Sequence, residues 1–279
     1  MAISGNAFVI GGGSGICRAT AIGFAKNGVK RLLVADLDLD NAFETAERCK
    51  SAAQNPDFVV KAIGVDVALP DSVRDAVSTM VKTFGRIDYC VNGAGITSPV
   101  PKHIMQVKFD QFRKVQEVNV NGTFLILSTV SAAMAAQEPR PNDEEQSSRG
   151  TSRGSIVNVA SVLSFGAIPR ASSYTSSKHA VVGLTRAAGS SLEHALALDN
   201  LENGIRVNCV CPAWVDTPMT QRACDKTPGF DRFVQSQLPM GRVATPEEIA
   251  DAILFLSSSK ASFITGSSLM VDGALSIRT

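Results

Sequence analysis

Residues 7–18 read AFVIGGGSGICR, a short apolar run followed by a glycine-rich turn and the start of a helical pattern. Glycines directly after a strand let the backbone turn tightly and approach a pyrophosphate at the amino terminus of the next helix. The common G-x-G-x-x-G fingerprint fits no register here, whereas G-x-x-x-G-x-[small] fits Gly11, Gly15 and Cys17. The residues of this turn that we expect to bind a dinucleotide are Gly11, Ser14, Gly15 and Ile16.

Beyond the turn, short apolar runs alternate with longer segments of helical period. The predicted strands are 7–10, 31–35, 59–65, 87–92, 155–160, 206–211 and 268–271. The predicted helices are 16–27, 41–53, 70–84, 109–137, 173–198 and 246–257. Continuous apolar strands are expected where helices cover both faces of a sheet. The pattern predicts an α/β fold, a single Rossmann-like doubly wound domain over 1–279 with a seven-stranded parallel sheet flanked by helices on both faces.

One polar segment, 138–153, has two prolines and no apolar period. We expect an exposed, mobile loop that joins a helix to a strand. Such a connection lies at the amino-terminal edge of a parallel sheet, whereas ligands bind at the carboxyl edge. A regulatory or partner-binding role stays open for this insertion.

The composition excludes several classes of protein. The 279 residues are 44% hydrophobic and carry a net charge of +1, which excludes a disordered chain and gives no electrostatic footprint for nucleic acid or anionic membrane. The longest apolar stretch, 124–136, is too short to span a bilayer. Six scattered cysteines indicate buried thiols in a reducing compartment, and three histidines give no zinc signature. We expect a cytoplasmic protein without a metal site.

Asp36 ends the second predicted strand. A carboxylate there accepts hydrogen bonds from both ribose hydroxyls of an adenosine and repels a 2′-phosphate. No basic residue stands at Ser14 or Leu37, so we expect NAD rather than NADP, with Asp36 and Leu37 at the adenosine. Capping of the next helix is the alternative role for Asp36. Asp66 and Val67 end the third strand and either meet the adenine or cap the helix that follows.

The spacing Tyr174-x-x-x-Lys178 places a phenol and an ammonium group on one face of a helix. A free tyrosine has a pKa of ~10, and a nearby lysine, aided by an oxidised nicotinamide, favours the phenolate. We therefore expect a lowered Tyr174 pKa and a general acid/base for carbonyl–alcohol interconversion. Ser161 follows the strand 155–160 and can polarise a substrate oxygen, and Asn119 interrupts a helical run.

A small-residue loop follows the fourth strand and is expected to flank the cofactor. Its candidate contacts are Asn92, Ala94 and Gly95.

Over its whole length the sequence resembles the short-chain dehydrogenase/reductase family. The resemblance implies a catalytic tetrad of Asn119, Ser161, Tyr174 and Lys178. In that family the Tyr is the acid/base, the Lys holds the nicotinamide ribose and lowers the Tyr pKa, the Ser orients the carbonyl, and the Asn anchors a water. The resemblance also implies that Pro212, Val215 and Thr217 meet the nicotinamide.

Three positions depart from the family pattern. Ile10 stands for the usual Thr, Cys17 for a third Gly, and Gly93 for a frequent Asn. We expect Ile10 to face Gly93 across two strands, and Cys17 to loosen the fit between helix and strand.

Residues 213–240 occupy the position of the family's substrate lid. Apolar residues here and after Ser161 predict a largely apolar pocket, although half or more of them would simply pack the lid onto the sheet. These residues are Trp214, Met219, Phe230, Phe233, Leu238, Met240, Val162, Leu163, Phe165 and Ile168. The polar candidates are His103, Arg170 and Arg222, while His179 and His194 share the helix of Tyr174. By family analogy, helices 109–137 and 173–198 pair between subunits of a homo-oligomer, a tetramer or dimer.

Together these observations predict an enzyme that transfers hydride between NAD(H) and a small-molecule secondary alcohol or ketone, bulky and largely apolar. Two other functions stay open: a non-redox isomerase or cyclase that uses the dinucleotide to orient its substrate, and a nucleotide-sensing binding protein. The intact tetrad argues against both, since a sensor does not need a tuned phenol.

Overall fold

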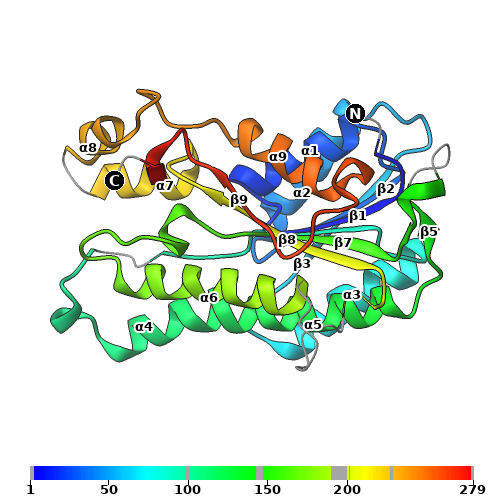
Figure 1. The fold of residues 1–279 in the computed structure, drawn as a ribbon, viewed down its shortest axis with the longest axis horizontal. Helices are drawn as coiled ribbons and strands as arrows, with labels where there is room; N and C mark the ends of the chain where they lie inside the picture. The colour runs from blue at the N-terminus through cyan, green and yellow to red at the C-terminus, as the bar shows by residue number, and fades with distance from the viewer. Residues whose placement is uncertain are drawn as a thin grey trace.

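Parallel strands form the centre of the fold, which is given by a computed structural model (Figure 1). The structure describes residues 3–97, 101–142, 147–189, 200, 202–226 and 229–277. One seven-stranded sheet has the order β3-β2-β1-β4-β7-β8-β9 and only parallel neighbours, as predicted. The strands are β1 Asn6–Ile10, β2 Arg31–Asp36, β3 Val59–Gly64, β4 Tyr89–Asn92, β7 Gly154–Val159, β8 Ile205–Pro212 and β9 Ser268–Val271. The strand order reverses between β1 and β4, and ligands bind at such a switch point.

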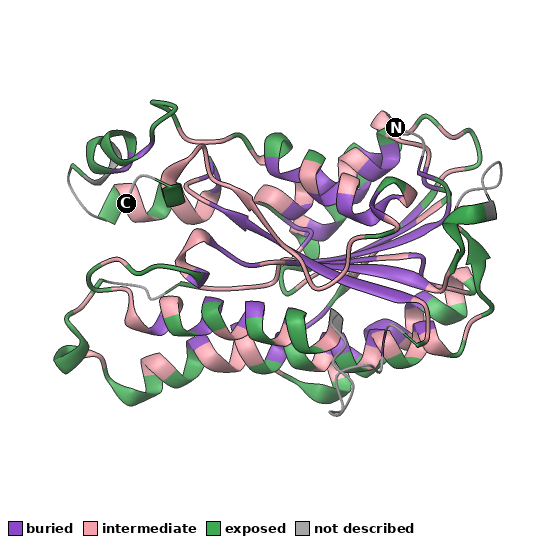
Figure 2. Cartoon of the chain, in the orientation of Figure 1, coloured by how far each residue is buried: buried purple, intermediate pink, exposed green. Residues whose placement is uncertain are grey.

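Helices cover both faces of the sheet (Figures 1 and 2). On one face lie α1 Gly15–Lys26, α2 Leu39–Ala52 and α9 Pro246–Ser257. On the other lie α3 Pro70–Phe84, α5 Gly122–Ala135 and α6 Ser172–Gly189. The buried central strands separate two apolar layers, which explains their continuous apolar sequences. Residues 190–198 of the predicted helix 173–198, with His194, lie outside the described residues.

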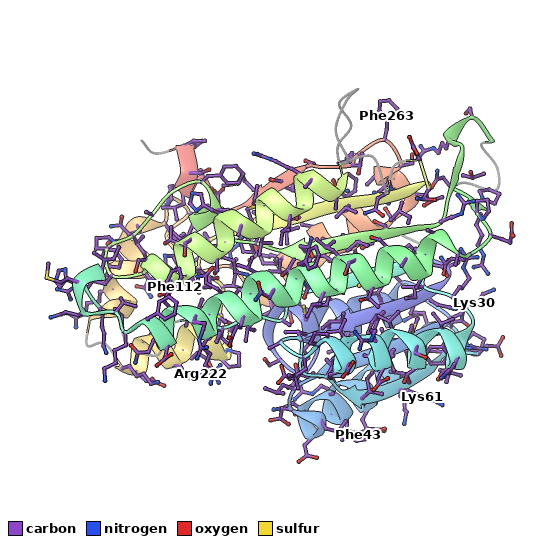
Figure 3. The ribbon with its side chains drawn as sticks, turned by 90° about the horizontal axis from the view of Figure 1, so that it is seen from below. Lys30, Phe43, Lys61, Phe112, Arg222 and Phe263 are labelled. Atoms are coloured by element: carbon purple, nitrogen blue, oxygen red, sulfur yellow. The ribbon has the colours of Figure 1, made fainter. Side chains whose placement is uncertain are left out.

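The predicted helix 109–137 is divided by a π-helical turn. α4 Phe109–Gln116 is followed by the π-helical turn Glu117–Asn121 and then by α5. Figure 3 shows that α4 and α5 run alongside α6. Taken as one run, Phe109–Ala135 has 27 residues and is long and apolar enough to cross a membrane by length and composition alone, with 39% of its most apolar window buried. The sequence analysis considered only the apolar stretch 124–136, which is shorter than this run. In the structure, the run packs against α3, α6 and the sheet.

Part of the polar insertion 138–153, predicted as a loop, forms regular secondary structure. Arg140–Pro141 (β5) and Thr151–Ser152 (β6) form a short antiparallel ladder, while 143–146 lie outside the described residues. Arg140 pairs with Asp88, directly before β4, so the insertion lies at the amino-terminal edge of the sheet, as predicted. The backbone carbonyl of Ser259 accepts a hydrogen bond from Arg149.

The region 213–240 contains two helices that the sequence analysis missed, α7 Pro218–Lys226 and α8 Phe230–Gln237. A parallel β-bridge between Val215 and Ala244 brings the two ends of this region together. Leu238 is buried, whereas Phe233 and Met240 are exposed. Of these three apolar residues of the predicted lid, one therefore packs in the interior and two are exposed to solvent.

Cys17 and Gly93 form a complementary pair, which corrects the expectation of a looser fit at Cys17. The Cys17 side chain is buried, with 3% of its surface exposed. A Cβ built on Gly93 would overlap the Cys17 Sγ, so the thiol occupies the space that a side chain at position 93 would need. Ile10 does not face Gly93: it pairs with Asn92, and its carbonyl accepts a hydrogen bond from the Gly93 N–H at 3.0 Å. Burial raises the pKa of the Cys17 thiol to about 12.

This pair predicts a non-additive double-mutant cycle. Gly93→Asn alone should destabilise the fold by about 1–3 kcal/mol because it overpacks a filled site. In a Cys17→Gly background the same change should cost at least about 1 kcal/mol less, since the thiol is gone. Urea unfolding of the four proteins measures both values, and additive costs would contradict the pairing.

Candidate active site

Three glycines of the β1–α1 turn stand where a side chain would collide with neighbouring elements. Gly11 has a φ of +76°, and a Cβ there would lie 2.7 Å from the backbone nitrogen of Ala94. Gly13 donates its N–H to Asp36 Oδ2 at 2.8 Å. A Cβ on Gly15 would lie 3.1 Å from Thr217. The turn is therefore held between the ends of β2, β4 and β8.

The turn ends at α1, whose first N–H groups have no intrahelical partner. Ser14 is its exposed N-cap, and Ile16 is half-buried in its first turn. At the end of β2, Asp36 also accepts the Asp38 N–H, and the adjacent Leu37 is 75% exposed. Capping of α2 falls to Asp38, which accepts the Asn41 N–H, so the alternative capping role of Asp36 is not used.

Three predicted cofactor contacts have side chains engaged within the protein. Asp66 accepts the Ala68 N–H at 2.9 Å, as a strand-end cap does. Val67 is buried in the apolar layer formed with α3 and α5. Asn92 is 3% exposed, and its Nδ2 donates to Thr123 and Asn158. The Asn92 Oδ1 is buried and has no hydrogen-bond partner among the described residues.

Ser161, Tyr174 and Lys178 come together where β7 ends and α6 begins. Ser161 lies two residues beyond the end of β7, and its hydroxyl forms a hydrogen bond with Tyr174. Lys178 lies one turn beyond Tyr174 on α6, with its Nζ 5.6 Å from the centre of the tyrosine ring. The buried Lys178 ammonium also donates to the Val159 carbonyl at 2.7 Å, which fixes its direction.

Burial controls the ionisation of this cluster. It raises the pKa of Tyr174 to about 12, and the hydrogen bond from Ser161 opposes the rise only in part. Burial also lowers the pKa of Lys178 to about 8. In the free protein, desolvation of the phenolate outweighs the hydrogen bond, so the lowered Tyr174 pKa stays a prediction for the protein with an oxidised nicotinamide bound.

Asn119 lies inside the π-helical turn, and its side chain is fully engaged. Its Oδ1 accepts the Ile96 N–H at 2.8 Å, while its Nδ2 donates to the Ile96 carbonyl and to Ser177 Oγ, both at 2.9 Å. Gly95 lies between Asn119 and Lys178: a Cβ on Gly95 would be 3.3 Å from Asn119 Oδ1 and 3.7 Å from Lys178 Nζ. The four tetrad residues therefore share one neighbourhood.

Sequence reasoning missed Ser177, which is 0% exposed. Its hydroxyl accepts from Asn119 and donates to the Tyr174 carbonyl at 2.7 Å, so it ties the π-helical turn to α6. Its position beside Lys178 gave no signal, because a serine within a helix commonly bonds to a carbonyl of the preceding turn.

The remaining candidates lie around this centre. Pro212 ends β8, and Val215 and Thr217 are buried next to the glycine-rich turn. Val162 and Leu163 are half-buried, while Phe165 is 48% exposed and stacks against Arg186. Arg222 is exposed on α7 (Figure 3). His103, Arg170 and His179 line a separate pocket. Within the described ranges, no three His, Cys, Asp or Glu side chains group closely enough to hold a metal ion.

The chain has only two tyrosines, which makes their ionisation directly measurable. An ordinary tyrosine would be about half ionised at pH 10, whereas one with a pKa of about 12 would be ~1% ionised. Burial raises the Tyr89 pKa as well. We expect no tyrosinate absorbance at 295 nm in the free protein up to about pH 10, with circular dichroism as the check on folding. Tyrosinate absorbance that appears near pH 8 in the unmodified protein, but not in Tyr174→Phe, would contradict the raised pKa of Tyr174.

Comparisons with known proteins agree with this geometry. A family model described as enoyl-(acyl carrier protein) reductase matches residues 11–276. The short-chain dehydrogenase fogB of Aspergillus ruber is 50% identical over 277 residues, covering 99% of this chain and 98% of that protein. The crystal structure of levodione reductase superposes with a TM-score of 0.85 at 29% identity, covering 98% of both chains. The 3-ketoacyl-(acyl-carrier-protein) reductase from Brucella melitensis, complexed with NADH, gives 0.80 at 29% identity, covering 97% of this chain and 98% of that one. The chain therefore belongs to the short-chain dehydrogenase/reductase family.

Proposed function

We propose that this oxidoreductase transfers hydride between NAD(H), in preference to NADP(H), and a bulky, largely apolar secondary alcohol or ketone. Membership of the family makes it an NAD(P)-linked enzyme that acts on CH–OH groups. The observation that carries the proposal is the contact between Ser161, Tyr174 and Lys178 next to the glycine-rich turn. Gly11 packs on Ala94, and Gly95 adjoins Lys178, so the turn and the reacting groups share one edge of the sheet.

The residues at this edge fit a dinucleotide. At Gly11, Gly13 and Gly15 a Cβ would press against Ala94, Asp36 and Thr217, so the tight turn requires glycine there, and it leads into the amino terminus of a 12-residue helix. Such a turn would hold the pyrophosphate, while Asp36 and Leu37 would meet the adenosine. Lys178, Val215 and Thr217 would lie toward the nicotinamide. When bound, the cofactor supplies or accepts the hydride.

The protein's own groups manage the proton. In ketone reduction, the neutral Tyr174 phenol donates its proton to the carbonyl oxygen, which Ser161 polarises by a hydrogen bond. Lys178, with a pKa of about 8, is ~90% protonated at pH 7 and stabilises the phenolate that remains. In alcohol oxidation the same phenolate accepts the proton. Asn119 acts as a positioning residue, because both its polar atoms fix the Ile96 segment beside Lys178.

Preference for NAD rests on Asp36. Its carboxylate accepts a hydrogen bond from the Gly13 N–H of the glycine-rich turn. Positions 14 and 37 hold Ser and Leu rather than a lysine or an arginine. A 2′-phosphate beside this carboxylate would place like charges together. The nearby Arg18 guanidinium is already paired with Glu44 and donates to the Gly13 carbonyl and to Thr45.

The apolar character of the substrate rests on Val162, Leu163 and the region 213–240 as a lid. We also propose a cytoplasmic homo-oligomer in which α4, α5 and α6 pair between subunits. The large apolar side chain of Phe124, 56% exposed on α5, supports a covered face there.

Replacing the phenol tests the acid/base assignment. Tyr174→Phe should lower kcat for ketone reduction by about 10²–10⁴-fold or more, while NADH affinity stays within about twofold. Tyr89→Phe is the matched control, because Tyr89 lies at the start of β4 and donates to the Ser4 carbonyl. Stopped-flow or steady-state nicotinamide absorbance over a ketone panel provides the readout. Turnover in Tyr174→Phe would reject the role, and NADH binding without any turnover of the unmodified protein would favour the sensor.

Neutralising Asp36 tests the cofactor preference. Asp36→Asn keeps an acceptor for the Gly13 N–H but removes the charge, so the NADH:NADPH ratio of kcat/KM should fall by roughly 10–100-fold. Asp40→Asn, exposed in the first turn of α2, should leave the ratio unchanged. An unmodified protein that prefers NADPH would contradict the assignment outright.

A further inference from the structure

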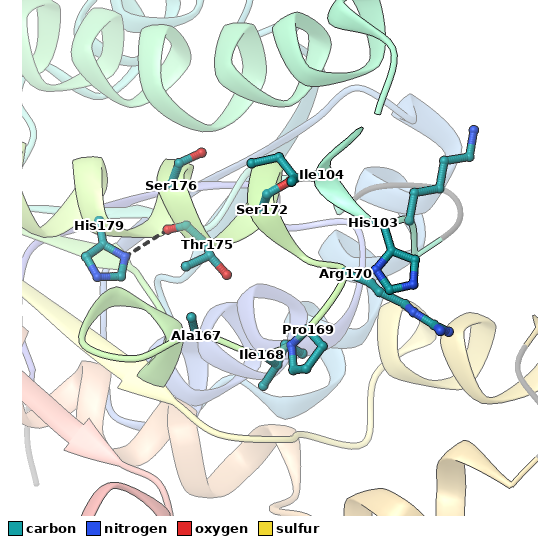
Figure 4. A pocket seen from close by; sticks show the side chains of 11 residues that line it. His103, Ile104, Ala167, Ile168, Pro169, Arg170, Ser172, Thr175, Ser176 and His179 are labelled. Atoms are coloured by element: carbon teal, nitrogen blue, oxygen red, sulfur yellow. Dashed lines mark hydrogen bonds between the residues drawn. The ribbon is translucent and has the colours of Figure 1, made fainter. Parts of the chain in front are cut away.

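A charged cluster joins α1 to α2 beside the glycine-rich turn. The Arg18 guanidinium on α1 forms an ion pair with Glu44 on α2 at 3.0 Å, and its Nε donates to Thr45 Oγ1 at 3.0 Å. The Arg18 side chain is 19% exposed and that of Glu44 is 48% exposed. Both helices cover the face of the sheet opposite to α6, which carries the pocket shown in Figure 4. The cluster therefore lies away from the proposed contact between subunits.

One residue of the turn contacts both this cluster and Asp36. Gly13 donates its N–H to Asp36 Oδ2 at 2.8 Å, and its carbonyl accepts a hydrogen bond from the Arg18 guanidinium. The same Arg18 nitrogen lies 3.4 Å from Asn41 Oδ1. A Cβ built on Gly13 would lie 2.8 Å from Asp36 Oδ2 and 3.0 Å from the Asn41 Cβ. The carboxylate and the guanidinium therefore flank one residue, where the function proposed above places the adenosine ribose.

The net charge of the cluster sets how this edge of the sheet responds to a 2′-phosphate. An unpaired guanidinium beside Asp36 would attract the phosphate and offset the repulsion from the carboxylate. Groups that flank one residue lie within the Debye length of about 8 Å at physiological ionic strength, so this attraction would be only partly screened. The pKa of the Glu44 carboxyl is lowered by a hydrogen bond from Arg48 and by the charge of Arg18, so the carboxylate is ionised at neutral pH. Its negative charge opposes that of the guanidinium.

We propose that Glu44 is a second residue that determines the preference for NAD(H), because its carboxylate cancels the positive charge of Arg18 that would attract a 2′-phosphate. This inference rests on the proposed function and deepens it: Asp36 supplies the repulsion, and Glu44 suppresses the attraction that would offset it. Arg18 is held against the turn by the Gly13 carbonyl and by Thr45. Its charge would therefore act on a 2′-phosphate without any rearrangement once Glu44 is neutral.

Glu44→Gln tests the proposal in the intact protein, because it removes the charge and keeps an oxygen that can accept from Arg18. Nicotinamide fluorescence measures the dissociation constants of NADPH and NADH without turnover. The NADPH constant should fall by about 3–10-fold, while the NADH constant stays within about twofold. At about 1 M salt, where the Debye length is about 3 Å, the gain should shrink to less than about twofold. Glu47→Gln is the matched control on the same helix, because Glu47 pairs with Lys50 instead, and it should leave both constants unchanged.

A double-mutant cycle assigns the effect to Arg18. In an Arg18→Gln background, Glu44→Gln should change the NADPH constant by less than about twofold, since the guanidinium that Glu44 neutralises is gone. Arg48, which also pairs with Glu44, is present in all four proteins, so an effect that acts through Arg48 would persist in this background. Circular dichroism and NADH binding check that each variant folds.

Three results would overturn the proposal: an unchanged ratio of the two constants in Glu44→Gln, an equal shift in Glu47→Gln, or a full shift without Arg18. If Asp36→Asn alters the ratio and Glu44→Gln does not, only this inference fails and the role of Asp36 stands. Tighter binding of NADPH than of NADH by the unmodified protein would reject the proposed NAD preference, and this inference with it.

Discussion

At the carboxyl ends of β1 and β4, two backbones lie so close that no side chain fits between them. Gly11 meets the Ala94 amide at this point, and its left-handed φ turns the chain directly into α1. The contact occurs where the strand order reverses, so it sets both the direction of α1 and the position of the loop that carries Gly95. Because Gly95 adjoins Asn119 and Lys178, the same contact places the reacting groups relative to the turn.

Burial is the main electrostatic influence on the reacting groups. It keeps the Tyr174 phenol neutral and makes the Lys178 ammonium easier to deprotonate, although the two lie one helical turn apart. A neutral phenol is the form that would donate a proton to a ketone in the reaction proposed above. The opposite direction needs a phenolate, whose stabilisation requires additional positive charge near the ring.

Much of the fold could be predicted because strand and helix periods differ strongly. All seven strands of the sheet were found, since parallel strands buried on both faces give continuous apolar runs. The π-helical turn at Asn119 was not predicted because the helical periodicity of the sequence continues through it. The helices α7 and α8 were not predicted because their sequences are as polar as those of loops. The tetrad could be named from its order, whereas the pKa of Tyr174 and the complementarity of Cys17 with Gly93 depend on packing that the sequence does not express.

The bridge between Val215 and Ala244 marks the boundary between the sheet with α9 and the intervening region with α7 and α8. Residues 216–243 leave and re-enter the fold at a single fixed point, so the span between can change length or composition without altering the register of β8 or the start of α9. Arg206 joins β8 to the end of α9, because its guanidinium donates to the Leu256, Ser257 and Ser258 carbonyls. With the function proposed above, exchange of residues 218–243 between relatives, which keeps Thr217 against Gly15, should alter which alcohols are accepted while leaving the groups that transfer the proton intact.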